Sequence, residues 1–110
     1  METIEIEQTL KRTGPRSYCV KMAVKQKDLM EVYEFNFKDT NGIYPLYKSL
    51  IYIIRLFNNV DIKLKTPSKV FAGEVNGKAG KNTRLYGILN DTKQQYGVEI
   101  DAVFVEKGRG

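Results

Sequence analysis

The sequence contains no histidine and no tryptophan, and Cys19 is its only cysteine. These absences exclude a disulfide framework, a zinc site built from Cys and His, and catalysis by a Ser–His or Cys–His pair. The chemistry that remains is that of carboxylates, lysines or hydroxyls, or none, and we expect no cofactor. Cys19 lies in an alternating segment, where an ordinary small packing or surface residue is expected.

Long hydrophobic runs are missing as well. The longest, residues 50–54, is broken by Arg55, whereas a membrane span needs roughly 20 apolar residues. The N-terminus begins acidic and lacks the basic and apolar leader of a secretory signal. We therefore expect a cytoplasmic protein with no membrane contact. Its 110 residues suit a single domain over 1–110, with a flexible tail at 106–110.

Acidic residues are outnumbered by basic ones, 13 to 18, and the bases concentrate in two segments. Residues 8–27 carry six bases and no acid, and residues 63–84 carry six bases against Glu74 alone. If the fold brings both segments together, they form a patch suited to a polyanion such as nucleic acid. Two separate solvated surfaces are equally compatible with this pattern.

Alternation of apolar and polar residues predicts three strands in the first third of the chain, at residues 3–7, 18–24 and 30–37. Gly14-Pro15 is expected as the turn between the first two. A helix follows over about 44–58, because Pro45 suits a first helical turn and the apolar residues after it recur at helical spacing.

The second half predicts a strand over 60–65 and a short helix from Thr66, as its N-cap, to Asn76. A further helix is expected from Asn82 or Thr83 to Gly97, followed by a last strand over 98–105. A meander followed by strand–helix–strand crossovers implies an α/β fold with a five-stranded mixed sheet and helices packed on it. We expect the Tyr- and Phe-rich third strand at the sheet edge, a surface suited to strand addition.

Several residues have both a functional and an ordinary interpretation. The loop 76–81 is rich in Gly and Lys but lacks the preceding strand and the Gly-Lys-Ser/Thr end of a phosphate loop. Glu5 and Glu7 share a strand face, where solvent exposure is favoured over a relic metal site. Asp61 and Asp101 are expected to pair with lysines. The tyrosines expected to be freest for stacking are Tyr44, Tyr47, Tyr52, Tyr86 and Tyr96.

Five short motifs, in order along nearly the whole chain, resemble the ribonuclease H fold family. Residues 14–18, Gly-Pro-Arg-Ser-Tyr, are similar to the turn and aromatic residue that open the family's second strand, and Thr40-Asn41-Gly42 resembles the lead into its first helix. Thr66-Pro67-Ser68 is similar to the family's Thr-Asp-Ser. Residues 81–86 resemble its Lys-Asn and Leu-aromatic pair, and residues 105–110 resemble its Val-Lys-Gly-His-Ala-Gly end.

Family members cleave the RNA strand of RNA–DNA hybrids with two divalent metals held by clustered carboxylates. The positions that match those carboxylates depart from the family pattern. Glu7 matches only with a one-residue slip, Pro45 and Pro67 occupy two acidic positions, and Arg109 stands in place of a histidine. The sequence also ends before the family's final acidic helix. The resemblance therefore implies a degenerate member with no catalytic residue, no metal site and no enzyme activity.

The function that these expectations favour is non-catalytic binding of nucleic acid, as RNA–DNA hybrid or a duplex, through segments 8–27 and 63–84. The resemblance places Arg16, Thr40 and Asn41 at positions where the family touches nucleic acid. The residues expected to extend this surface are Lys78, Lys81, Arg84 and Arg109. One alternative is a protein-interaction adaptor or regulator, for example one encoded by a mobile element. Another is a true nuclease whose carboxylates are misaligned.

Overall fold

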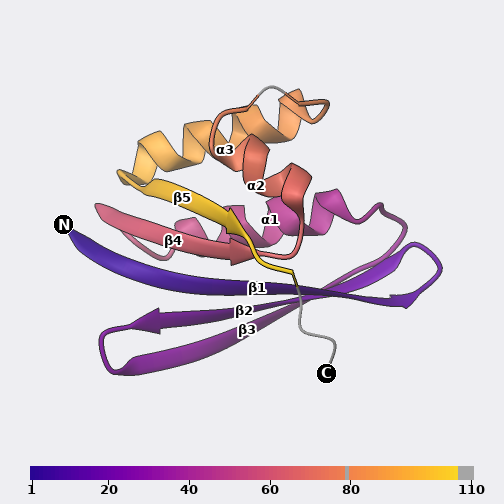
Figure 1. Cartoon of the computed structure of the whole chain (residues 1–110), viewed down its shortest axis with the longest axis horizontal. Coiled ribbons are helices and arrows are strands. Elements are labelled where there is room, and N and C mark those ends of the chain that lie inside the picture. The colour runs from indigo at the N-terminus through magenta and orange to yellow at the C-terminus, as the bar shows by residue number, and fades with distance from the viewer. Residues whose placement is uncertain (79, 107–110) are drawn as a thin grey trace.

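The computed structural model describes residues 1–78 and 80–106. Within them five strands and three helices follow one another in the predicted order (Figure 1). The elements are β1 (Glu2–Gly14), β2 (Ser17–Gln26), β3 (Leu29–Phe37), α1 (Ile43–Ile54), β4 (Val60–Thr66), α2 (Lys69–Val75), α3 (Thr83–Tyr96) and β5 (Glu99–Phe104).

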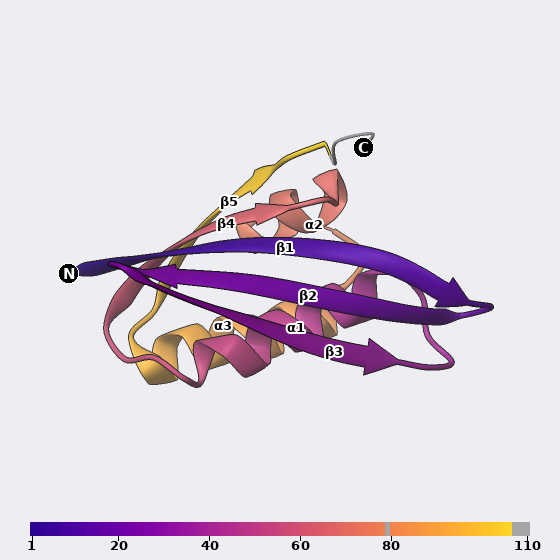
Figure 2. The same ribbon diagram turned by 90° about the horizontal axis from the view of Figure 1, so that it is seen from below.

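The strands form a mixed five-stranded sheet in the order β3-β2-β1-β4-β5. β1 pairs antiparallel with β2 and β2 with β3, whereas β1 pairs parallel with β4 and β4 with β5. Seen from below, β1, β2 and β3 lie in front of α1 and α3 (Figure 2). The α/β class, the parallel second half and the edge position of β3 are thus confirmed.

The core lies between the helices and one face of the sheet. Ile4 and Ile6 of β1 and Ile62 and Leu64 of β4 are buried, whereas the residues between them on each strand are more exposed. α1 is the most deeply placed helix, and most of its residues are buried. Burial of this apolar area supplies the main driving force for folding.

Two predicted boundaries differ from the structure. β1 continues to Gly14, well past residue 7, because β2 pairs with it along almost its whole length. α1 ends at Ile54 and not at 58, because the backbone then closes into tighter turns. The N–H groups of Arg55 and Leu56 bond to carbonyls three residues back, those of Tyr52 and Ile53.

The predicted N-cap of α2 is wrong. Thr66 is the last residue of β4, and its hydroxyl donates to Gln8, so Ser68 caps the helix instead. The Ser68 Oγ accepts the backbone N–H of Phe71 at 3.1 Å, which satisfies one free donor of the first turn.

The predicted limits of α3 are confirmed. The helix begins at Thr83, and after Tyr96 it is terminated by Gly97, which adopts a left-handed conformation with φ of 67°. A side chain at this position would collide with the Asn59 side chain, so both the backbone angle and the packing require glycine.

No helix in the described ranges is long and apolar enough to cross a bilayer. The expected flexible tail at 106–110 lies, apart from Glu106, outside the described residues.

Candidate nucleic-acid interface

Three of the predicted contact residues meet where the β1–β2 turn approaches the start of α1. Arg16 is exposed in the turn, and its carbonyl accepts the backbone N–H of Thr40 at 3.0 Å. Asn41 is also exposed, and its Oδ1 accepts the N–H groups of Ile43 and Tyr44 at 3.1 and 3.0 Å. The side-chain amide oxygen of Asn41, which precedes the N-cap residue Gly42, thus satisfies two free N–H groups at the start of α1. The backbone bond between Thr40 and Arg16 places the β1–β2 turn beside the segment that leads into α1.

The other predicted bases lie between α2 and α3. Lys78, Lys81 and Arg84 are all exposed, and Arg84 occupies the first turn of α3. That turn contains no acidic residue, so the positive end of the helix dipole adds to the basic side chains. Arg109 lies outside the described residues.

The backbone fixes Lys78 at the end of α2. Gly77, with φ of 98°, closes the helix, and the Lys78 N–H bonds to the Gly73 carbonyl at 2.9 Å. The Gly77 N–H bonds to the carbonyl of Glu74 at the same distance. This pair of bonds is the usual glycine-terminated end of a helix, as Asn76-Gly77 predicted, and it sets the direction in which Lys78 leaves the helix.

A buried carboxylate links this basic segment to α1. Glu74 of α2 is only 4% exposed, and it accepts the Tyr47 hydroxyl of α1 at 2.5 Å. Both its oxygens accept the side-chain amide of Asn82, at 3.2 and 3.1 Å. A side chain at Gly80 would collide with this carboxylate. Glu74 therefore anchors the segment that carries Lys81 against α1, the same helix whose first N–H groups bond to Asn41.

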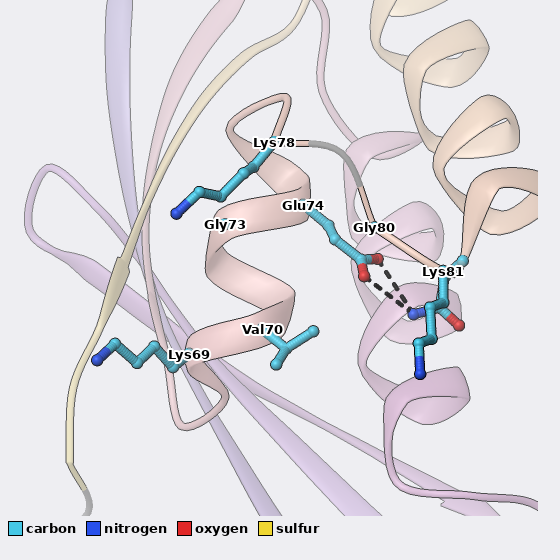
Figure 3. A pocket seen from close by; sticks show the side chains of 8 residues that line it. Lys69, Val70, Gly73, Glu74, Lys78, Gly80 and Lys81 are labelled. Atoms are coloured by element: carbon cyan, nitrogen blue, oxygen red, sulfur yellow. Dashed lines mark hydrogen bonds between the residues drawn. The ribbon is translucent and has the colours of Figure 1, made fainter.

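A cavity of about 670 Å³ opens between α2 and residues 80–82. In Figure 3 the Glu74 carboxylate points from α2 toward this segment, Lys69 and Lys78 extend to the other side of α2, and Lys81 extends from the far wall. The residues that line the cavity are Lys69, Val70, Gly73, Glu74, Lys78, Gly80, Lys81 and Asn82. Hydrogen bonds hold the Glu74 carboxylate toward Asn82, and of the three lining lysines only Lys81 extends from the wall opposite α2 (Figure 3).

Of the tyrosines predicted to be free, Tyr47 is fully buried, and Tyr86 and Tyr96 are partly buried against the core. The Tyr47 ring packs edge-to-face against Phe71 with centroids 4.8 Å apart. Burial, and next the hydrogen bond to Glu74, raise the pKa of Tyr47 well above its ordinary value. The hydroxyl is thus a fixed donor to the carboxylate.

This raised pKa predicts a loss of stability in alkali. The unfolded chain releases the Tyr47 proton above about pH 10, while the folded chain retains it, so the free energy of unfolding should fall as pH rises from there. Urea unfolding at pH 8, 10 and 11 measures this slope. Tyr47→Phe should flatten the slope relative to the parent protein, and Tyr44→Phe, at an exposed tyrosine, should leave it unchanged.

The sheet face opposite the helices, called here the open sheet face, is charged but balanced. Glu5 lies between Lys25 and Lys63 of the neighbouring strands, and Glu7 lies opposite Lys65. Lys63 also forms an ion pair with Asp101 at 3.4 Å. The pairing expected for Asp101 is confirmed, whereas Asp61 lies opposite Thr3 and Glu99 and has no ion pair within the described part of the chain. Glu5 and Glu7 lie among lysines. The bases in segments 8–27 and 63–84 that lie on this face are therefore offset by neighbouring acids.

Cys19 is buried on β2. Burial, and next the nearby Glu34 carboxylate, raise the pKa of its thiol. This disfavours the reactive thiolate and agrees with an ordinary packing residue.

A neutral polar network lies beneath α1, beside the middle of β1 and the end of β4. The Gln8 amide donates to the Leu46 carbonyl at 3.1 Å and to Ser49 at 3.2 Å, and it accepts the Thr66 hydroxyl at 2.6 Å. Gln8, Ser49 and Thr66 are all buried. Each polar group thus has a partner inside the protein, which is the condition for burying it at low cost.

The side chains of this polar network do not fit a pair of divalent cations, which need several close carboxylates. The adjacent surface depression has two, Glu7 and Glu106, with Lys65 beside them. Across residues 1–78 and 80–106, no three His, Cys, Asp or Glu side chains are arranged to hold a metal ion.

Sequence reasoning missed both buried polar clusters, although each left a signal. Glu74 is the only acid in segment 63–84 and lies three residues after Phe71, on the same buried helix face. Gln8 continues the inward series of Ile4 and Ile6. A polar residue at an inward position of a strand indicates a buried partner.

Compared with known proteins, the sequence matches no family model and no curated protein. The structure, however, resembles solved ribonuclease H domains. It matches the N-terminal RNase H domain of a Mycobacterium tuberculosis protein with a TM-score of 0.77 and 16% identity, covering 99% of this chain and 86% of that one.

Two further structures agree with this likeness. LC11-RNase H1, in complex with an RNA/DNA hybrid, gives a TM-score of 0.74 at 11% identity over 97% of this chain and 86% of that one. RNase H1 from the halophilic archaeon Halobacterium salinarum gives 0.71 at 14% identity over 96% and 86%. The chain is thus an α/β protein with a mixed five-stranded sheet. Within that class it has the ribonuclease H-like fold, as its motifs predicted.

Proposed function

We propose that this protein binds nucleic acid, as RNA–DNA hybrid or a duplex, and does not cleave it. The observation that carries the proposal is the unbalanced charge of the α2–α3 segment. Lys78, Lys81 and Arg84 are exposed there, while the one acid, Glu74, is buried and hydrogen-bonded. Counterion release by such a group of bases favours binding to a phosphate backbone.

Only some of the bases in segments 8–27 and 63–84 are proposed to contact nucleic acid. Lys21, Lys25 and Lys63 lie on the open sheet face among acids, so their charge is largely offset. The α2–α3 segment and the Arg16 turn carry exposed bases outside that face. A ribonuclease H with the same fold has been solved with an RNA/DNA hybrid, which supports hybrid as the first ligand to test.

The absence of cleavage is proposed from the chemistry of the polar network beneath α1, at the end of β4. Gln8, Ser49 and Thr66 form a neutral network there, and Pro45 and Pro67 occupy helix and turn positions near it. Amide and hydroxyl groups that already bond to one another are poor replacements for the carboxylates that hold catalytic metals.

Fluorescence anisotropy with labelled RNA–DNA hybrid, double-stranded RNA, double-stranded DNA and single strands tests both parts of the proposal. The titrations are run at low and physiological salt with Mg²⁺ and with Mn²⁺, and the probes are then checked for cleavage. We expect binding that weakens steeply with salt, and intact probes. Cleavage that is lost on Glu7→Gln would establish a nuclease, and no binding to any probe at low salt would refute the binding function.

A further inference from the structure

β3 is a sheet edge without the usual protection. Over residues 1–78 and 80–106, its backbone hydrogen bonds go to β2 alone, and its nine residues contain no proline, lysine or arginine. Its register with β2 runs without a bulge from Tyr18–Phe37 to Gln26–Leu29. Natural proteins usually block such an edge with lysine, proline or a bulge, because its free N–H and C=O groups accept another strand.

The opposite edge of the same sheet is partly covered. On β5, the Asn76 side chain donates to the Ala102 carbonyl and accepts the Ala102 N–H, both at 2.8 Å. This amide occupies the place of a neighbouring strand. The molecule therefore protects one edge with a side chain and leaves the other open.

The open edge combines apolar and acidic side chains. Leu29, Met30 and Val32 are 71%, 62% and 62% exposed, which is high for apolar residues within a strand. Glu31 and Glu34 are the charged residues of β3, and both are acidic. Two copies of β3 would bring four carboxylates together without a base, so self-pairing is electrostatically disfavoured.

The side chains that β2 places opposite β3 indicate the sequence pattern of a strand that would pair with its free edge. On the open sheet face it places Lys21 opposite Glu34, and on the helix face it places Val20 opposite Phe35. On the helix face the α1 rings of Tyr52 and Tyr44 pack edge-to-face on Phe35 and Phe37 of β3, with centroids 5.3 and 6.2 Å apart. Both tyrosines remain exposed.

We propose that β3 binds an extended peptide segment of another protein by strand addition. The segment carries apolar side chains at alternate positions, which pack beside the α1 tyrosines, and Lys or Arg at the positions between them, which face Glu34. Backbone hydrogen bonds give affinity in this mode, and the alternating side chains give selectivity. This site is separate from the α2–α3 segment, so it does not depend on the proposed nucleic-acid function.

The test titrates the ¹⁵N-labelled protein with the peptide acetyl-Val-Lys-Val-Lys-Val-Lys-Val-amide and follows backbone NMR shifts. We expect the largest shifts at residues 29–37, and at least tenfold weaker binding when glutamate replaces every lysine of the peptide. A peptide with proline in place of the valine at position 3 should not bind, because proline breaks the added ladder.

A matched pair of variants completes the test. Val32→Lys places a cation at the centre of the β3 edge, and it should weaken the lysine peptide at least tenfold while strengthening the glutamate peptide. Val103→Lys makes the same change on β5, in the same cross-strand row and at a side chain 53% exposed, and should change neither. Equal binding of both peptides, or shifts centred elsewhere, would refute the proposal. Concentration-dependent shifts at 29–37 without peptide, with a dimer in sedimentation, would replace it with self-association.

Discussion

Replacing Lys78, Lys81 and Arg84 together with alanine is expected to weaken binding to RNA–DNA hybrid roughly a hundredfold at low salt. These three bases are exposed, whereas Glu74, the one acid among residues 63–78 and 80–84, is buried and hydrogen-bonded to Tyr47 and Asn82, so the charged side chains that this segment exposes are all basic. If each contacts one phosphate, the slope of log affinity against log salt should fall by about 2.7. Anisotropy titrations of both proteins across a salt series measure this change.

The control is an equal loss of charge on the open sheet face. Replacing Lys21, Lys25 and Lys63 with alanine removes three bases that lie among acids, and it should reduce affinity less than threefold. Should this control variant lose more affinity than the α2–α3 variant, nucleic acid binds on the sheet and not beside Glu74. Equal losses would indicate attraction to the net charge alone.

The sequence predicted the elements well because their signals are local. Strand alternation identified β2 and β3 almost to the residue, and the glycines at 77 and 97 marked the ends of α2 and α3. The N-cap of α2 was mispredicted because Thr66 and Ser68 both suit a cap. Pairing of β4 with β5 reaches Thr66, and this tertiary contact decides between them.

The candidate site was harder to predict because its organising contacts are distant in sequence. Family resemblance assigned Arg16 and Thr40 to nucleic-acid contact, and the structure joins these two residues, which are 24 positions apart, by one backbone bond. Glu74 and Tyr47 are 27 residues apart, and nothing local connects them. Counting charges along the sequence also cannot distinguish one lysine from another. In the structure, Lys25, Lys63 and Lys65 lie opposite glutamates of β1, whereas Lys78 and Lys81 lie outside the sheet.

Glu74→Ala is expected to cause the largest loss of stability of any variant considered, about 2–4 kcal/mol. The change removes a buried acceptor that holds the hydroxyl of Tyr47 and the amide of Asn82. A buried donor without a partner costs more than the bond it made, because it loses water and gains nothing. For a chain of this size the melting temperature should fall by about 9–17 °C. Calorimetry or thermal circular dichroism measures it.

Glu99→Ala on the surface of β5 is the matched control and should change stability by no more than about 0.5 kcal/mol. Because Glu74→Ala reduces folding, a double-mutant cycle on its two partners tests the Glu74 hydrogen bonds with a smaller loss of stability. Tyr47→Phe and Asn82→Ala each remove one donor to the same carboxylate, so their effects on the free energy of unfolding should be coupled by about 0.5 kcal/mol or more. Strict additivity would mean that Glu74 makes two independent contacts and does not join α1 to the basic segment.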